Sequence, residues 1–203
     1  MKAIVELKNA TKVVTNGFNE ERIILDKVNL TIYQGDFITI LGGNGAGKST
    51  LFNVIAGTLP LTSGSVHILG EDVTNWPAEK RAKYLARVFQ DPKMGTSPRM
   101  TVAENLLIAK YRGEGRGLVP RKLSQQIEEF AQLLPRVGNG LEKHLETPAG
   151  LLSGGQRQAL SLLMASLKQP ELLLLDEHTA ALDPKTSQSL MQLTDELIAT
   201  KGM

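Results

Sequence analysis

Apolar residues in the first third of the chain occur in short runs separated by polar and turn residues, which is typical of β-strands. Residues 3–7 (AIVEL) and 24–32 (ILDKVNLTI) are two such runs, and apolar and polar residues alternate from Val28 to Ile32 as on a half-buried strand. Residues 61–73 return to strand and turn chemistry. The pattern predicts an antiparallel β layer in which this third segment pairs with the opening strands.

A different pattern follows the opening strands. Residues 36–42 (DFITILG) form a near-continuous apolar run that ends in glycine, as in a strand buried on both faces of a parallel sheet. A helix is predicted next, over residues 48–59, with Gly57 and Pro60 as its stop signals. A buried strand followed at once by a helix indicates an α/β arrangement.

The middle of the chain, from Pro92 to about Pro148, consists of helix-like stretches joined by glycine-rich and basic links. Residues 102–112 and 124–137 are the two main stretches, and we interpret the region as an inserted helical lobe. The remainder is expected to hold a helix over 153–168, a strand over 172–176 and a helix that begins near Lys185.

Composition narrows the function classes. A chain of 203 residues suits one compact unit. The formal net charge of +2 gives no field that favours nucleic-acid binding, and the absence of cysteine excludes disulfides and thiolate metal sites. The N-terminus lacks the apolar core of a signal peptide, and no apolar run approaches the about 20 residues that span a bilayer. Any role at a membrane is therefore expected to depend on a partner.

The segment GGNGAGKS fits the phosphate-loop pattern G-x-x-x-x-G-K-[ST], and it lies between the predicted strand and the predicted helix. Glycines let several backbone N–H groups point into one concavity, and the helix N-terminus adds partial positive charge. A plain glycine-rich turn with a surface lysine is the alternative, which the strand and helix context disfavours. The expected nucleotide-binding residues are Gly42, Gly43, Asn44, Gly45, Ala46, Gly47, Lys48, Ser49 and Thr50, with Lys48 at the β and γ phosphates and Ser49 on Mg²⁺.

An acidic pair ends the apolar run LLLLDE. Asp176 falls at the carboxyl end of the predicted strand, where open α/β sheets gather their ligand sites, and is expected to hold Mg²⁺. Glu177 is expected to orient or deprotonate the attacking water. A pair of helix-capping acids would look the same in isolation, but the phosphate loop in the same chain favours catalysis.

A second helix N-terminus that can bind an anion is predicted at LSGGQ, where Ser153 is a candidate N-cap. One phosphate loop needs no second phosphate grip. The second anion-binding motif therefore indicates a phosphate site that is completed by another copy of the chain.

The runs GGNGAGKST and LSGGQRQALSLLMASLKQPELLLLDE resemble the nucleotide-binding subunit of an ATP-binding cassette (ABC) transporter of the importer type, and the similarity extends over essentially the whole chain. The resemblance implies a phosphate-loop NTPase core with a parallel sheet, an N-terminal antiparallel β layer and an inserted helical subdomain. It implies one domain over 1–203, with residues 1–90 and 158–203 as the core and 91–157 as the helical subdomain that carries the signature motif.

The resemblance also assigns roles. Two subunits would pair head to tail, so that the signature residues grip the γ-phosphate bound at the partner's phosphate loop. Gln90, in FQDP, would contact Mg²⁺ and the attacking water and join Glu177 and Lys48 in catalysis, while Asp183, in AALD, would communicate across the dimer. Magnesium would be held by Ser49, Gln90 and Asp176. The signature residues are Leu152, Ser153, Gly154, Gly155 and Gln156.

The chain departs from the family pattern in several places. Gly43 replaces a common proline, Ala180 a common serine, and Val14 with Phe18 stands where an adenine-stacking ring is usual. No residue matches the family's switch histidine, because His178 directly follows Glu177. The histidines His67, His144 and His178 are therefore expected to be structural or solvated rather than catalytic. The C-terminal part of the core is expected to be missing, so either the natural protein is longer or this chain is poorly stable and weak in hydrolysis.

The favoured function is an ATPase that binds ATP and Mg²⁺ and drives transport by separate membrane permease subunits, with import of amino-acid-type solutes suggested by the segments 89–106 and 176–186. Expected partners are a second cassette and an extracytoplasmic solute-binding protein, at the cytoplasmic face of the membrane. The alternatives are a soluble ABC ATPase without a transport role, a nucleotide-binding module without hydrolysis, and a small-molecule kinase or nucleotide switch, which would leave LSGGQ unexplained.

Overall fold

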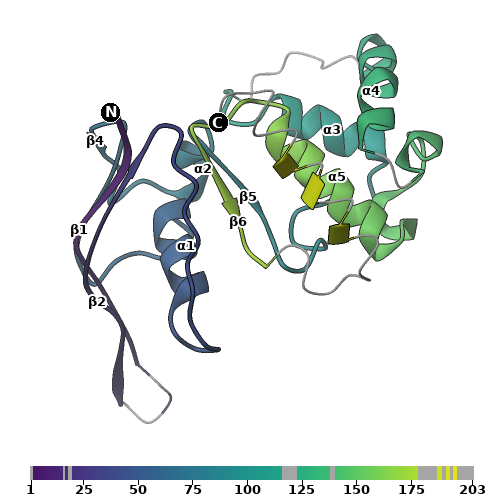
Figure 1. The fold of residues 1–203 in the computed structure, drawn as a ribbon. Coiled ribbons are helices and arrows are strands. Elements are labelled where there is room, and N and C mark those ends of the chain that lie inside the picture. The colour runs from purple at the N-terminus through teal and green to yellow at the C-terminus, as the bar shows by residue number, and fades with distance from the viewer. Residues whose placement is uncertain are drawn as a thin grey trace. The chain divides into compact units, whose positions relative to one another are not determined.

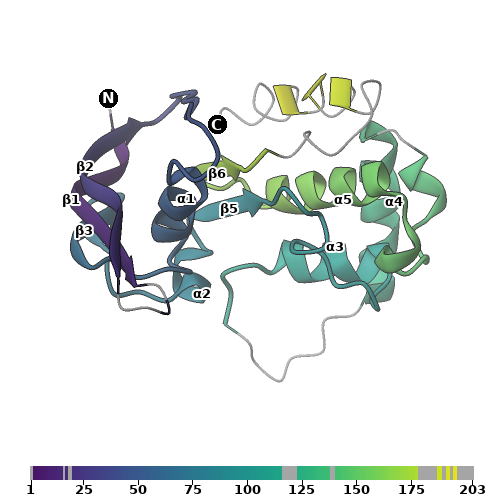
Figure 2. The same cartoon turned by 90° about the horizontal axis from the view of Figure 1, so that it is seen from below.

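The chain divides into two compact units, Met1–Leu85 and Ala86–Met203 (Figures 1 and 2). The structure, a computed structural model, describes the residues 2–15, 17, 20–115, 123–137, 140–177, 187–188, 191–192 and 194–195. The boundaries expected from the sequence, a core of 1–90 and 158–203 around a lobe of 91–157, remain a prediction.

Unit 1 is built on a four-stranded antiparallel sheet of order β2-β1-β3-β4. The predicted β layer and the pairing of its third segment with the opening strands are confirmed. In β2 the alternation is also confirmed, because Ile32 is buried and Val28 and Leu30 are half-buried while Asn29 and Thr31 are exposed. The strands are β1 (Ala3–Thr15), β2 (Glu21–Tyr33), β3 (Ser63–Ile68) and β4 (Glu71–Asp72).

Helix α1 (Lys48–Ala56) follows the glycine-rich segment and buries Leu51, Val54 and Ile55. It ends at Gly57, whose φ of 81° lies in the left-handed region that favours glycine. A Cβ at this position would lie 2.7 Å from Arg81 Nε, so space as well as backbone angle requires glycine. The predicted stop signal is confirmed.

Buried Arg81, at the end of the short helix α2 (Ala78–Arg81), holds the C-terminus of α1. Its Nη1 donates to the carbonyl oxygens of Val54 (2.8 Å) and Ile55 (2.9 Å). Its Nε donates to Trp76 O (3.1 Å) and its Nη2 to Thr74 O (3.0 Å). Burial lowers the pKa of Arg81, and these carbonyls compensate the buried charge.

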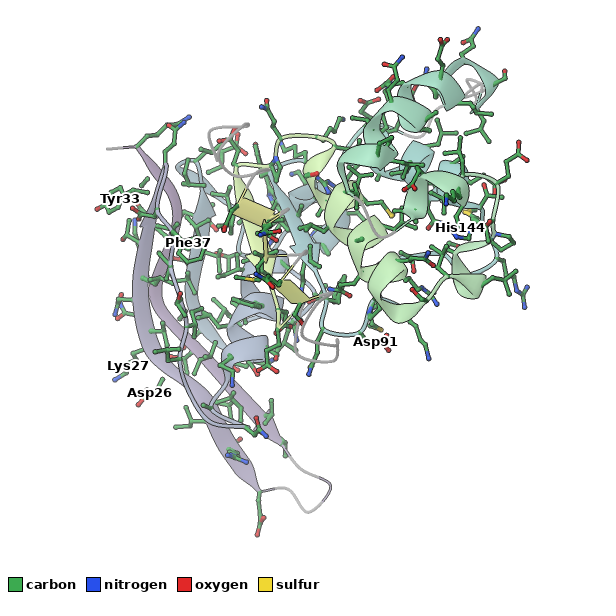
Figure 3. All side chains as sticks on the ribbon, turned by 45° about the vertical axis from the view of Figure 1, so that its right-hand side comes forward. Asp26, Lys27, Tyr33, Phe37, Asp91 and His144 are labelled. Atoms are coloured by element: carbon green, nitrogen blue, oxygen red, sulfur yellow. The ribbon has the colours of Figure 1, made fainter. Side chains whose placement is uncertain are left out.

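The strand predicted over residues 36–42 is not formed. This segment is irregular in the structure, and Phe37 (Figure 3) and Leu41 are 75% and 87% exposed. At the start of this segment, Asp36 N donates to Tyr33 O in a turn rather than to a neighbouring strand. An apolar run becomes a strand only where a neighbouring strand accepts its N–H groups, and the four-stranded sheet of unit 1 ends at β2 and β4 without it.

Within its described residues, unit 2 combines a two-stranded sheet with the helices α3, α4 and α5 and short 3₁₀ turns. The strands of this sheet are β5 (Leu85–Val88, which begins at the last residue of unit 1) and β6 (Leu172–Leu175). The helices are α3 (Val102–Lys110), α4 (Ile127–Leu133) and α5 (Gly154–Ser166), and the 3₁₀ turns are Leu123–Gln125, Leu134–Arg136, Leu141–Lys143 and Ala149–Leu151.

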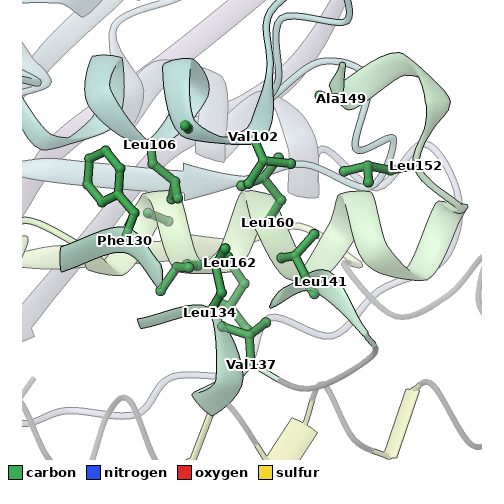
Figure 4. Close-up of a cluster of buried hydrophobic side chains, with 14 of the residues drawn as sticks. Val102, Leu106, Phe130, Leu134, Val137, Leu141, Ala149, Leu152, Leu160 and Leu162 are labelled. Atoms are coloured by element: carbon green, nitrogen blue, oxygen red, sulfur yellow. The ribbon is translucent and has the colours of Figure 1, made fainter. Parts of the chain in front are cut away.

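The hydrophobic core of unit 2 lies between these helices (Figure 4). Leu106 of α3, Phe130 of α4 and Leu160 of α5 are completely buried in it. Because a bulky apolar residue from each helix meets the others here, the core fixes how α5 packs, and the signature motif begins that helix.

The helices predicted at 102–112 and 153–168 are confirmed as α3 and α5. The helix predicted over 124–137 is shorter, because Pro135 lies in a 3₁₀ turn after α4 and cannot continue an α-helix. The start expected near Lys185 falls outside the described residues, while residues 187–188, 191–192 and 194–195 are helical. Within the described part of the chain, the search for a helix with the length and apolar character of a membrane span finds none.

Replacing Arg81 with methionine is expected to lower the free energy of unfolding of unit 1 by about 3 kcal/mol, because buried carbonyls lose a charged donor. Urea denaturation followed by the fluorescence of Trp76, the single tryptophan, measures this change. Arg22→Met alters an exposed arginine of β2 and should cost less than about 0.5 kcal/mol. Equal losses in the two variants would contradict the role of Arg81.

Candidate nucleotide site

The phosphate loop enters α1 through two glycines in the left-handed region, Gly45 (φ 79°) and Gly47 (φ 91°). Gly47 is the N-cap of the helix, and no side chain caps it. Lys48 Nζ donates to the carbonyl oxygens of Gly42 (2.7 Å) and Gly43 (3.2 Å), so the ammonium group lies along the loop itself.

Gly47 is required by packing as well as by its backbone angle. A Cβ there would lie 3.0 Å from the carbonyl oxygen of Ile24 in β2. Gly43 differs, because its φ is not positive and a Cβ would meet no atom within 4 Å. The close approach of loop and strand therefore depends on one glycine, while the position that departs from the family's proline is permissive.

The first turn of α1 is suited to an anion. A helix N-terminus carries partial positive charge on N–H groups that side chains satisfy in most helices. Here the N-cap is a glycine, and Lys48 lies within reach of the same loop. Ser49, the next residue, is exposed and places a hydroxyl at the helix start. This arrangement can bind a phosphate chain and its metal ion.

Unit 2 brings together Gln90 and Glu177, which are predicted to be catalytic, and Asp176, which is predicted to hold Mg²⁺. Asp176 N donates to Val88 O (3.0 Å), which extends the pairing of β6 with β5 by one residue. Gln90 Nε2 donates to Glu177 Oε2 (3.4 Å). Glu177 itself has φ 42°, a strained angle for a non-glycine residue. The pairing of two strands thus places the amide and both carboxyl groups at one end of the sheet.

Arg87 is the residue at this end of the sheet that the sequence analysis missed. Its Nη2 lies 2.6 Å from Asp176 Oδ2, and the two side chains are only 10% and 13% exposed. Its guanidinium also lies over the ring of Phe89, 4.6 Å from the centroid. A lone cation within the apolar strand LARV was the available signal, but only the pairing of β5 with β6 identifies its partner.

Each unit offers one oxygen ligand of the kind that magnesium takes at nucleotide sites. In the described part of the chain, no group of three His, Cys, Asp or Glu residues could hold a metal. Magnesium at nucleotide sites requires no such cage, because one or two protein oxygens and the phosphates suffice. Asp176, in unit 2, offers a carboxylate oxygen beside the Arg87 guanidinium, and Ser49, in unit 1, offers a hydroxyl oxygen.

The signature motif forms a capping box at the start of α5. Ser153 Oγ accepts from Gln156 N (3.2 Å), and Gln156 Oε1 accepts from Ser153 N (3.1 Å). Leu152 is buried, whereas Ser153 and Gly154 are exposed and a Cβ at Gly154 would meet nothing within 4 Å. The predicted N-cap is confirmed, and the motif presents an open helix start.

Helix α5 is tied to the segment that follows Gln90. Arg157 Nε donates to Thr96 Oγ1 (2.6 Å), and Gln158 Nε2 donates to Phe89 O (3.1 Å). Both side chains are buried, so the link is protected from water. A shift of the segment around Gln90 would therefore move the helix that begins with the signature motif.

The predicted site residues fall in both units of the chain. The phosphate loop belongs to unit 1, whereas Gln90, the acidic pair and the signature motif belong to unit 2. Val14 is 38% exposed near the end of β1, His67 lies in β3, and His144 follows a 3₁₀ turn. The residues Phe18, His178, Ala180 and Asp183 lie outside the described part of the chain.

Residues 25–180 match the family described as ABC transporter. The tyrosine transport ATP-binding protein of Clostridioides difficile (strain R20291) is 42% identical over 200 residues, which cover 98% of this chain and 79% of the relative. The phosphonates import ATP-binding protein PhnC 1 of Rhodopseudomonas palustris (strain BisB18) is 36% identical over 199 residues, covering 96% and 70%.

Solved structures agree with these relatives. A dimeric bacterial ABC transporter cassette superposes with a TM-score of 0.80 at 28% identity, covering 98% of this chain and 84% of that chain. A dimeric ATP-binding cassette in a post-hydrolysis state with ADP and Pi gives 0.74 at 32% identity with the same coverage. The fold class predicted from the sequence, an α/β phosphate-loop NTPase with a parallel sheet, is confirmed.

Gly47→Ala is expected to weaken ATP binding about tenfold or more, because a left-handed angle costs a non-glycine residue roughly 1–3 kcal/mol and the new methyl group meets Ile24 O. Gly43→Ala adds the same methyl group in open space and should leave the affinity within about twofold. Titration with a fluorescent ATP analogue measures both. Equal losses would show that the loop geometry described here does not govern binding.

Proposed function

We propose that this chain, which belongs to the ABC transporter family and is an ATPase of that family, pairs head to tail with a second cassette around two Mg²⁺-ATP and thereby drives solute import by separate membrane permease subunits. The observation that carries the proposal is the signature motif. The exposed residues Ser153 and Gly154 stand at the start of α5, where an anion can bind. The nucleotide on the phosphate loop of the same chain is already held there, so the signature motif is free to bind the nucleotide of a second cassette.

The phosphate loop supplies the grip on the nucleotide. N–H groups of residues 43–50 and the Lys48 ammonium would neutralise the β and γ phosphates. Lys48 donates to Gly42 O and Gly43 O, two neutral acceptors, so transfer to phosphate oxygens replaces neutral acceptors with negatively charged ones, which bind the ammonium more strongly. Magnesium, held by Ser49, Asp176 and Gln90, would supply charge neutralisation at the phosphates.

Hydrolysis needs a group that accepts the proton of the attacking water. Glu177 is suited to this role because it is exposed and lies just beyond the end of β6, next to Asp176 in the chain. Gln90 donates to Glu177 Oε2, so it holds the carboxylate in one orientation and leaves lone pairs for a water proton. Water oxygen then bonds to the γ-phosphorus as the bond to the ADP oxygen breaks, and the proton moves to Glu177.

The link between α5 and the segment after Gln90 supports coupling between the signature motif and the catalytic amide. Arg157 and Gln158 hold Thr96 and Phe89, on either side of the loop that contains Gln90 and Asp91. A signature motif that closes on a partner's γ-phosphate would therefore act on the position of Gln90. The family resemblance implies that Asp183 also communicates between the two cassettes of this dimer.

Import of a small solute is the favoured physiological role. Relatives are named for tyrosine transport, for phosphonate import and, in Haemophilus ducreyi at 38% identity, for spermidine and putrescine import. An amino-acid-type solute agrees with the 42% identical relative. Membrane permease subunits, an extracytoplasmic solute-binding protein and attachment at the cytoplasmic face of the membrane complete this proposal.

Glu177→Gln is expected to lower phosphate release about 10²–10⁴-fold, because the proton acceptor is lost while ATP binding is kept. The variant should therefore form a dimer in Mg²⁺-ATP that the parent forms only transiently. Light scattering and phosphate release, measured on the same samples, test this. ATP binding without a dimer in either protein would contradict the head-to-tail arrangement.

Ser153→Ala is expected to abolish the ATP-dependent dimer while lowering the free energy of unfolding by only about 1 kcal/mol, the usual cost of a lost N-cap. Thr101→Ala is its matched control, because Thr101 forms the same capping box with Glu104 at the start of α3. The two variants should unfold at similar urea concentrations. If both keep the dimer, or both lose it, the signature serine has only a capping role.

A further inference from the structure

The strongest unexplained feature of unit 2 is the ion pair between Arg87 and Asp176. Asp176 is the carboxylate that the proposed function gives to magnesium, and the inference that follows rests on that function. Arg87 Nη2 lies 2.6 Å from its Oδ2, and both side chains are about nine-tenths buried. Magnesium and the guanidinium are therefore directed to the same carboxylate.

Two cations at one buried carboxylate oppose each other. Water and salt screen this repulsion poorly because the pair is largely buried. Phe89 strengthens the position of the guanidinium, because its ring lies 4.6 Å below Arg87 and such cation–π contacts hold the planar group in place. Phe89 is in turn fixed at its carbonyl by Gln158. Arg87 is thus held where a dication must compete with it.

We propose that Arg87 is a positioning residue that holds Asp176 in the metal-free cassette and competes with Mg²⁺ for it, so that Arg87 sets the concentration of Mg²⁺ at which the site is loaded. In the metal-free chain the guanidinium compensates a buried carboxylate that would otherwise be costly. Free Mg²⁺ would bind only the carboxylate of Asp176 and would have to displace the guanidinium of Arg87. Mg²⁺ that arrives with a nucleotide is also bound by phosphate oxygens. Loading by metal is thereby coupled to loading by nucleotide.

The test measures the affinity for a fluorescent ATP analogue as a function of Mg²⁺ concentration, in the parent and in Arg87→Gln. The half-saturating Mg²⁺ concentration is expected to fall about tenfold in the variant, the size of a typical coupling between linked sites. The affinity in EDTA should be unchanged, because the phosphate loop is intact. Lys110→Gln is the control, since it removes a cation of another ion pair in unit 2, with Glu129 at 2.5 Å.

A double-mutant cycle assigns the effect to the pair. In an Asp176→Asn background, Arg87→Gln should no longer change the Mg²⁺ requirement, because the shared carboxylate is gone. If Arg87→Gln folds poorly by circular dichroism, Arg87→Lys replaces it. Lysine keeps the charge without the planar group that lies over Phe89, so the expected fall is smaller but in the same direction.

The outcomes separate the two proposals. ATP binding with an unchanged or raised Mg²⁺ requirement in Arg87→Gln overturns the competition and leaves the proposed function standing. Failure of the parent to bind the ATP analogue at any Mg²⁺ concentration overturns the proposed function, and this inference with it. A fall in Arg87→Gln and Arg87→Lys that disappears in the Asp176→Asn background supports the competition.

Discussion

The start of α1 is the feature on which the nucleotide site depends. Of the three longest helices that the structure describes, α3 and α5 begin with a Ser or Thr capping box, whereas α1 begins with Gly47 and no side-chain cap. A helix start without a cap is stable in a folded protein if another partner takes its N–H groups. Phosphate is such a partner, so the missing cap is the structural counterpart of the binding function.

The C-terminal ends of α1 and α5 are each satisfied by an arginine side chain. Arg81 takes carbonyls at the end of α1, and Arg112 donates to Ala165 O (3.2 Å) and Lys168 O (3.1 Å) at the end of α5. Both guanidinium groups have lowered pKa values because they are buried. The delocalised charge suits carbonyl acceptors at a helix C-terminus, where the helix dipole also favours a cation.

Helix α5, which begins at the signature motif, is anchored in the core of unit 2 and has an exposed N-terminus. Leu160 and Leu162 are completely buried beside α3 and α4, so the position of α5 in unit 2 is fixed. Its first turn contributes the exposed Ser153, and its next residues hold the loop that contains Gln90. One helix therefore carries the group expected to meet a partner's phosphate and the bonds that would report that contact.

Local patterns in the sequence determined the elements whose stabilising groups are near in the chain: the alternation in β2, the start of α5 at Ser153, the end of α1 at Gly57 and the phosphate loop. They failed where a partner is distant. Residues 36–42 form a largely apolar run but no strand, because strand formation requires a neighbouring edge that no local pattern specifies. In the sequence Arg87 is a lone cation in an apolar run, and only the pairing of β5 with β6 places it against Asp176. Sequence thus decides what each segment can form, and tertiary structure decides which distant charges and strands become partners.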